Sequence, residues 1–222
     1  MHVVVNAATS VDGKLSTRER RQLRISGPED FARVDRLRAE SDAVMVGVGT
    51  VLADDPRIGL DDPEPIAERE ARGEPPRPAR VVADSRARTP PEARILDGSA
   101  PTYLLVSDAA PDDRLAQLDR ETVRIVRAGG ERVDLRAGLA AVEADGIDRL
   151  MVEGGGELLF SLFSLGLVDE LSLYVGSLVI GGRDAPTLAD GEGFLYDSEF
   201  PDLELREVER IGDGVLLRYG VE

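Results

Sequence analysis

Residues 149–165 read RLMVEGGGELLFSLFSL, and this stretch indicates the class of fold. The apolar run Arg149–Val152 has the length of a buried strand, whereas Glu157–Leu165 has the apolar spacing of a helix. Three glycines, Gly154 to Gly156, stand between the two, and a residue without a Cβ lets the backbone turn tightly or approach a ligand. A strand that passes through a glycine turn into a helix predicts a β-α-β unit and a parallel sheet.

The start of the helix after the three glycines is also a candidate anion site. Its N–H groups and the positive end of the helix dipole suit a pyrophosphate. The spacing matches neither the G-x-G-x-x-G pattern nor the P-loop pattern. A phosphate site and a tight turn without a ligand therefore both remain open for this stretch.

Short apolar runs alternate with amphipathic segments along the rest of the chain. The alternation predicts a single α/β domain with a mainly parallel central sheet and, around Ile211-Gly212-Asp213-Gly214, an antiparallel C-terminal hairpin. An acidic, proline-rich segment around residues 61–79 predicts an exposed loop. Strands are expected at His2–Ala8, Ala43–Val48, Arg80–Ala83, Thr102–Val106, Thr122–Val126, Arg149–Val152, Leu171–Val175, Leu203–Arg210 and Val215–Val221, and helices from Pro28 through Arg38 and at Pro111–Leu118, Val133–Ala144 and Glu157–Leu165.

The charge of the chain excludes several classes of partner. Its 222 residues include 43 acidic and 27 basic ones, a formal net charge of −16. Nucleic acid and anionic membrane surfaces need a basic footprint, so neither is expected as a partner. Lys14 is the only lysine, and all other basic residues are arginine. Excess acid with little lysine indicates a salt-adapted, halophilic source, although a GC-rich genome would also favour arginine over lysine.

The chain has no cysteine, and His2 is its only histidine. Disulfides, thiolate catalysis, the usual zinc sites and a Ser/His/Asp triad are therefore excluded, and no metal site is expected. No apolar run approaches the roughly 20 residues of a membrane span. No signal peptide precedes the first strand, so a cytoplasmic location is expected.

Three further segments contain candidate site residues at the ends of predicted strands. The only asparagine, Asn6, and Lys14 fall close together, and a lone lysine could anchor an anion or polarise a carbonyl. Thr50 follows a glycine-rich strand end, with Asp54 one helical turn further on. The third segment is Asp84-Ser85-Arg86, where the arginine fork suits a 2′-phosphate. Chance placement or a solvated surface remains the alternative for each.

These segments occur in one order along the chain: NAATSVDGKL, RISGPEDFARVDRLRAESDAVMVGVGTVLADDPRI, RPARVVADSRARTP and RLMVEGGGELLFSLFSLGLVDELSLYVGSLVIGG. The series closely resembles the riboflavin-pathway reductases. That family comprises the stand-alone archaeal 2,5-diamino-6-ribosylamino-4(3H)-pyrimidinone 5′-phosphate reductases and the reductase half of the bacterial bifunctional deaminase-reductase. The deaminase half needs a His/Cys/Cys zinc site that this chain cannot supply, so the chain resembles the stand-alone type.

The resemblance implies a dihydrofolate-reductase-like fold, a homodimer and NADPH as the hydride donor. It also implies reduction of the phosphoribosylamino group, opened to its imine or carbonyl form, to the ribitylamino product. The residues that fall where the family holds NADPH are Ala8, Thr50, Asp54, Asp84, Ser85, Arg86, Gly154, Gly155, Gly156 and Glu157. Those that fall where it meets the substrate are Lys14, Arg38, Ile58 and Glu153, of which Lys14 and Glu153 are expected to hold the opened sugar and act in catalysis.

Two positions depart from the family pattern. Asp35 stands where relatives often have histidine, and Asp61 stands where some bacterial relatives have arginine, a contact for which Arg57 is a candidate replacement. Two other functions remain open. One is a pteridine or dihydrofolate reductase on the same fold, and the other is a non-catalytic nucleotide-binding protein.

Overall fold

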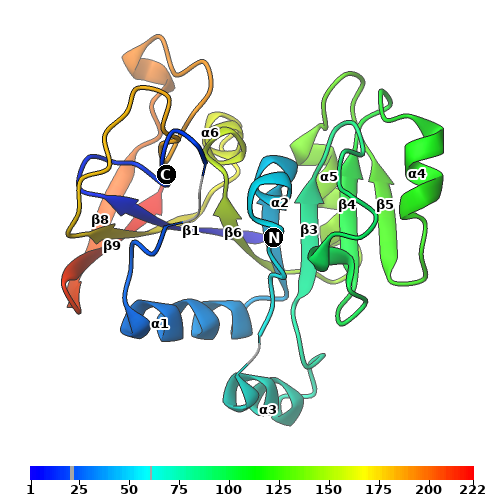
Figure 1. The fold of residues 1–222 in the computed structure, drawn as a ribbon, viewed down its shortest axis with the longest axis horizontal. Helices are drawn as coiled ribbons and strands as arrows, with labels where there is room; N and C mark the ends of the chain where they lie inside the picture. Colours follow the sequence, from blue (N-terminus) through cyan, green and yellow to red (C-terminus); the bar gives the residue numbers. More distant parts are fainter. Residues whose placement is uncertain (21–22, 61) are drawn as a thin grey trace. The chain divides into compact units, whose positions relative to one another are not determined.

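A computed structural model describes residues 1–20, 23–60 and 62–222, and the chain divides into two compact units (Figure 1). The first unit comprises Met1 and Asp35–Met151, and the second comprises His2–Val34 and Val152–Glu222. Helix α1 (Pro28–Ala39) and strand β6 (Arg149–Gly154) each contain a point at which the chain passes from one unit to the other.

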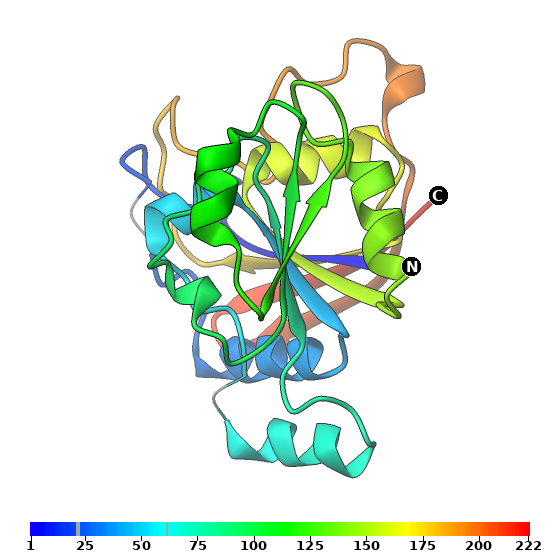
Figure 2. The ribbon, with the colours of Figure 1, turned by 90° about the vertical axis from the view of Figure 1, so that its right-hand side faces the viewer.

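The first unit contains four parallel strands in the order β5-β4-β3-β2. Val44, Met45 and Val46 in β2 are fully buried, as is typical of a strand covered on both faces. Figure 2 shows helices α4 and α5 on opposite sides of β4 and β5. The elements of this unit are β2 (Ala43–Gly47), α2 (Val48–Asp54), α3 (Pro63–Ala71), β3 (Ala79–Ala83), a 3-10 helix at Arg94–Leu96, β4 (Thr102–Val106), α4 (Asp112–Leu118), β5 (Val123–Arg127) and α5 (Leu135–Glu143).

Helix α3 lies within the segment around residues 61–79 that was predicted to be a loop, so that prediction was wrong. Both of its prolines, Pro63 and Pro65, stand in the first turn. The N–H groups of this turn have no acceptor within the helix, so a residue without an N–H loses no hydrogen bond there. The Asp62 side chain caps this turn by accepting a hydrogen bond from the Glu64 N–H. Asp61 lies outside the described residues.

The second unit combines parallel and antiparallel pairing. Strand β1 (His2–Ser10) runs parallel to β7 (Glu170–Gly176), and β9 (Gly214–Val221) lies antiparallel between β7 and β8 (Leu203–Ile211). Tyr174, Ile211 and Leu216 form a buried cluster where these strands meet. The remaining elements are α6 (Gly156–Ser164) and a 3-10 helix at Asp197–Glu199.

The strand pairs confirm the predicted fold class: α/β, mainly parallel, with an antiparallel C-terminal hairpin. The hairpin turns at the predicted residues, with Ile211 opposite Gly214. Strand β2 ends one residue before the predicted Val48, because α2 begins there. Among the described residues, no helix has both the length and the apolar character needed to cross a membrane. That the chain is a single domain stays a prediction.

Candidate active site

The triple-glycine turn joins β6 to α6 in the second unit. Gly154 has a φ of +128°, a conformation that requires glycine, and the peptide bond between Gly154 and Gly155 is cis. A Cβ on Gly156 would lie 2.4 Å from the carbonyl oxygen of Thr187 and 2.8 Å from Oδ2 of Asp190. The Gly156 carbonyl also accepts a hydrogen bond from the Asp190 N–H at 3.1 Å. Gly156 is therefore required by close packing against a chain segment far away in the sequence.

Lys14 contacts the same distant segment. Its Nζ donates to the carbonyl oxygen of Ala185 at 3.1 Å, and its backbone forms an isolated antiparallel bridge with Thr187. The next residue, Leu15, donates its N–H to the Pro186 carbonyl at 2.9 Å. The segment Ala185–Asp190, hereafter the 185–190 segment, thus brings Lys14 and the glycine turn together. Sequence reasoning missed this segment, for which Pro186, a few residues after Gly181-Gly182, is a weak signal.

Asp12 fixes the turn that presents Lys14. Its carboxylate accepts hydrogen bonds from the Ser10 hydroxyl at 2.6 Å, the Ile180 N–H at 3.0 Å and the Gly181 N–H at 2.7 Å. The Ser10 hydroxyl, followed by these backbone groups, lowers the pKa of the Asp12 carboxyl to about 2. The carboxylate is therefore ionised at neutral pH, and the turn before Lys14 is tied to the chain after β7.

The other predicted residues of the second unit differ in exposure. Glu153 is half-buried near the end of β6, whereas Glu157, in the first turn of α6, is exposed. Ala8 packs against the buried cluster that contains Tyr174, its partner on β7. The structure therefore gives Ala8 a packing role.

Asn6 belongs to a buried polar network in the second unit. The Arg33 guanidinium donates to Oδ1 of Asn6 at 2.9 Å, to the Ser172 hydroxyl at 2.9 Å and to the Asp30 carboxylate at 2.8 Å. All four side chains are buried. Buried polar groups need such partners, so the single asparagine is accounted for by the packing of α1 against β1 and β7.

In the first unit, Asp84 and Ser85 follow the carboxyl end of β3. Oδ2 of the fully buried Asp84 accepts hydrogen bonds from the N–H and the hydroxyl of Thr89, both at 2.7 Å. Oδ1 of Asp84 is also buried, and among the described residues it has no hydrogen-bond partner. The Ser85 hydroxyl accepts from the Val133 N–H at 3.1 Å, and its carbonyl accepts from the Ser107 hydroxyl at 2.7 Å. The chain after β3 is thereby joined to the chain after β4 and to the start of α5.

Arg86 is exposed and pairs with Glu131. The distance between the guanidinium and the carboxylate is 2.7 Å, and both side chains are mostly in solvent. Such surface ion pairs contribute little free energy, about 0–1 kcal/mol, so an incoming anion can replace Glu131 at small cost.

Thr50 and Asp54 lie one turn apart on α2, and both are half-buried. Burial raises the pKa of the Asp54 carboxyl above its ordinary value. The next residue, Asp55, has a left-handed backbone and accepts a hydrogen bond from the Arg94 N–H at 2.8 Å. This bond fixes the chain at the point where α2 ends.

Arg38 contacts the residue that follows Ile58. The Arg38 guanidinium donates to the Gly59 carbonyl at 3.3 Å and to the Asp35 carboxylate at 3.2 Å. The Ile58 side chain is buried, and the Ile58 carbonyl accepts from Nε of Arg80 at 2.9 Å. A polar contact to a ligand at Ile58 would therefore use its backbone N–H.

In each unit, candidate groups follow the carboxyl ends of parallel strands, as in the α/β proteins that bind ligands there. The chain belongs to the RibD C-terminal domain family, whose model matches residues 1–217. The resemblance seen in the sequence motifs is thereby confirmed.

Relatives match almost the whole chain. An Archaeoglobus fulgidus protein named 2,5-diamino-6-ribosylamino-4(3H)-pyrimidinone 5′-phosphate reductase is 49% identical over 213 residues, which are 96% of this chain and 94% of the relative. A protein of the same name from Methanothermobacter thermautotrophicus is 44% identical over 221 residues, 100% of this chain and 98% of the relative. The crystal structure of a pyrimidine reductase-like protein from Corynebacterium diphtheriae has a TM-score of 0.81 at 19% identity, covering 100% of this chain and 92% of that one. This likeness shows the shared fold.

Proposed function

We propose that the chain reduces the ribosyl side chain of 2,5-diamino-6-ribosylaminopyrimidinone 5′-phosphate to the ribityl form in riboflavin biosynthesis, with NADPH as the hydride donor. The observation that carries the proposal is the match to the Archaeoglobus protein of that name, 49% identical and aligned over 94% of its length. The contacts of Lys14 and Gly156 with the same segment also support it, because both residues belong to motifs that resemble the family.

In its imine form, the opened side chain would take up a hydride at C1′ and a proton at its nitrogen on reduction. The Lys14 ammonium is suited to stabilise charge on the sugar, because it is held by Ala185 O and an ammonium has two further N–H bonds. Glu153, half-buried at the end of β6, is the proposed second contact to the opened sugar. Most of the catalysis would then come from positioning the reacting carbon.

The residues present fit NADPH in the first unit. Oδ1 of Asp84 is a buried acceptor without a partner among the described residues, which a ribose hydroxyl would satisfy. Arg86 lies two residues further along and offers a guanidinium, with Thr50 and Asp54 on α2 as the other proposed contacts. In the second unit, the start of α6 has no side-chain cap, so its N–H groups after the glycine turn are a further proposed phosphate contact. When bound, reduced nicotinamide supplies the hydride.

Replacing Arg86 with alanine is expected to raise the Kd for NADPH about tenfold or more while changing the Kd for NADH less than about twofold. The reason is that only NADPH has the 2′-phosphate that the guanidinium would grip. Titration calorimetry with both dinucleotides measures the difference, and Arg88→Ala, another exposed arginine of the same segment, is the control. Equal losses for the two dinucleotides would contradict the assignment of Arg86.

The direct test is loss of reduced-nicotinamide absorbance when the protein, in molar KCl, is mixed with NADPH and the phosphoribosylaminopyrimidine. High salt is chosen because we propose that the net charge of −16 is a salt adaptation. Turnover with dihydrofolate instead of the pyrimidine would favour the pteridine-reductase alternative. NADPH binding without oxidation of NADPH by either compound would favour the non-catalytic one.

We further propose that the chain acts in the cytoplasm as a homodimer of single-domain subunits, with β8 at the dimer interface. All residues from Leu203 to Arg210 are exposed, and Leu205 and Val208 are exposed by 53% and 60%. A long edge strand with exposed apolar side chains is a template on which another chain can pair. A second copy is the proposed cover.

Leu205→Asp is expected to convert the dimer to a monomer, because it buries a carboxylate in the proposed interface. Sedimentation equilibrium in molar KCl measures the mass of each variant. The control is Leu52→Asp on α2, an exposed leucine of the first unit that is not part of the proposed interface and should leave the mass unchanged. A wild-type protein that sediments as a monomer would refute the proposed interface.

A further inference from the structure

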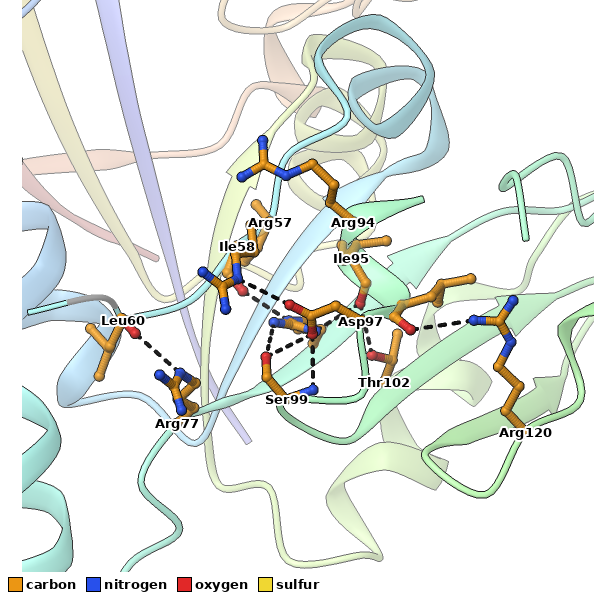
Figure 3. A network of polar contacts seen from close by, with 12 residues as sticks. Arg57, Ile58, Leu60, Arg77, Arg94, Ile95, Asp97, Ser99, Thr102 and Arg120 are labelled. Carbon is orange, nitrogen blue, oxygen red and sulfur yellow. Dashed lines mark hydrogen bonds and ion pairs between the residues drawn. The ribbon is translucent and has the colours of Figure 1, made fainter. Parts of the chain in front are cut away.

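The turn Arg57–Leu60, after α2, is held by an unusual set of contacts. Three successive carbonyls each accept a hydrogen bond from a different guanidinium: Ile58 O from Arg80 at 2.9 Å, Gly59 O from Arg38 at 3.3 Å and Leu60 O from Arg77 at 3.1 Å. Figure 3 shows the contact between Arg77 and Leu60. Charged donors make stronger bonds than neutral ones, so the path of this short segment is closely fixed.

The backbone of Ile58 needs this support. Its φ is +46°, in the left-handed region, which a β-branched residue rarely adopts. Such a conformation persists only where the surrounding structure imposes it. The Ile58 side chain, 6% exposed, and the Leu60 side chain, fully buried, anchor the turn in the interior of the protein.

Arg80 is the centre of the support. Its side chain on β3 is 1% exposed, and all three of its nitrogens donate hydrogen bonds. Besides Ile58 O, the acceptors are Ile95 O at 2.9 Å, the Asp97 carboxylate at 2.7 Å and the Ser99 hydroxyl at 2.7 Å. The guanidinium is therefore locked in one orientation by the chain from Ile95 to Ser99.

Asp97 connects Arg80 to Arg57, the first residue of the turn. Its second carboxylate oxygen accepts from Nε of Arg57 at 3.0 Å, as Figure 3 shows. Burial raises the pKa of the Asp97 carboxyl, but hydrogen bonds from Arg80, Ser99 and Arg57 outweigh burial and hold it well below its ordinary value. Asp97 is thus ionised at neutral pH. Arg57 and Ile58 are both tied to the Arg80–Asp97 pair.

Stability alone does not account for a guanidinium buried in β3. Taking a charge out of water is costly, and apolar side chains of similar volume often replace a buried ion pair without loss of stability. What an apolar side chain cannot do is hold the Ile58 carbonyl in a fixed place. The network is better explained by the position it gives to the turn.

We propose that Arg80 is a positioning residue that acts through Ile58 and fixes the Arg57–Leu60 turn for contact with the pyrimidine substrate. The proposal rests on the proposed function and on the family resemblance, which implies that Ile58 and Arg38 meet the substrate. The turn links these two residues, because Gly59 O accepts a hydrogen bond from Arg38.

The test compares Arg80→Lys with Arg69→Lys. Arg69 is a matched control: it lies in the same unit, is 2% exposed and donates to the carbonyls of Pro75, Ala39 and Ser41, none of which belongs to the turn. Lysine keeps the charge in both variants but loses the planar fork. Arg80→Lys is expected to raise KM for the phosphoribosylaminopyrimidine about tenfold and to leave KM for NADPH within about twofold. Arg69→Lys should change neither KM, whatever its effect on thermal stability.

Amide hydrogen exchange of the peptide that contains residues 57–60 separates this proposal from the proposed function. The exchange should accelerate in Arg80→Lys and not in Arg69→Lys. If the wild type does not reduce the pyrimidine, the proposed function fails by that result alone. If the wild type is active, an unchanged substrate KM or an unchanged exchange rate in Arg80→Lys overturns the positioning role. Should Arg80→Lys not fold, Ser99→Ala is the second variant, because it removes one acceptor of Arg80. It is expected to raise KM for the pyrimidine and to accelerate the exchange of residues 57–60. If neither quantity changes, the positioning role is overturned.

Discussion

Replacing Lys14 with alanine is expected to lower kcat about a hundredfold or more, which is the usual effect of removing a group that stabilises transition-state charge. The Kd for NADPH should change less than about twofold, since Lys14 itself is not one of the proposed cofactor contacts. The structural reason is that Ala185 O and the bridge to Thr187 hold the Lys14 ammonium in a defined place. Single-turnover oxidation of NADPH measures the chemical step, and calorimetry measures the binding.

Arg18→Ala is the control for the loss of one positive charge in this acidic chain, because Arg18 is an exposed basic residue of the same segment. It should leave kcat within about twofold, as surface substitutions usually do. If Lys14→Ala raised only KM for the pyrimidine and left kcat unchanged, Lys14 would be a binding residue without a part in the chemical step.

Much of the fold could be predicted from local patterns. The apolar runs in β1 and β2 are typical of buried strands, and both runs are buried in the structure. The hairpin of β8 and β9 was identified by Gly212 and Gly214 between two alternating segments. These features depend on neighbours in the sequence, which is why single-sequence reasoning finds them.

Helix α3 was missed because proline was read as a sign of loop, without regard to its place in a helix. Pro63 and Pro65 both stand in the first turn, where they are compatible with a helix. Arg80 and Arg69 were missed as buried residues, because arginine is normally exposed. Their burial depends on acceptors distant in the sequence, such as Ile58 O and Ala39 O, which no local pattern reveals.

The candidate site was predictable only where a local feature of the sequence marked a residue. The glycines and the single lysine could be singled out by their rarity or by their place after a strand. The 185–190 segment, which joins Lys14 to Gly156, has neither helical nor strand periodicity and was not found. Asn6 was as rare as Lys14, yet its contacts with Arg33 give it a structural role. Rarity in the sequence therefore marks constrained residues without telling binding from packing.

Gly156→Ala is expected to destabilise the protein by about 1–3 kcal/mol, as overpacking of a closely fitted site does. The added Cβ would lie 2.4 Å from Thr187 O, a backbone atom that cannot rotate away. The 185–190 segment would have to shift, and Lys14 would move with it, because Lys14 is bridged to Thr187. The variant should therefore lose kcat as well as stability. Thermal unfolding, at about 2–4 °C per kcal/mol for a chain of this size, and steady-state kinetics measure the two effects.

Gly49→Ala in α2 makes the same chemical change where a Cβ would meet nothing within 4 Å. Alanine is preferred to glycine inside a helix, so this control should raise stability by about 0.5–1 kcal/mol. The two substitutions are thus expected to change stability in opposite directions. The difference between them separates the steric contact at Gly156 from the general effect of replacing glycine. If Gly156→Ala were neutral, the 185–190 segment would be able to move without cost. Its hydrogen bond to Lys14 could then not be what holds the ammonium in place for the reaction.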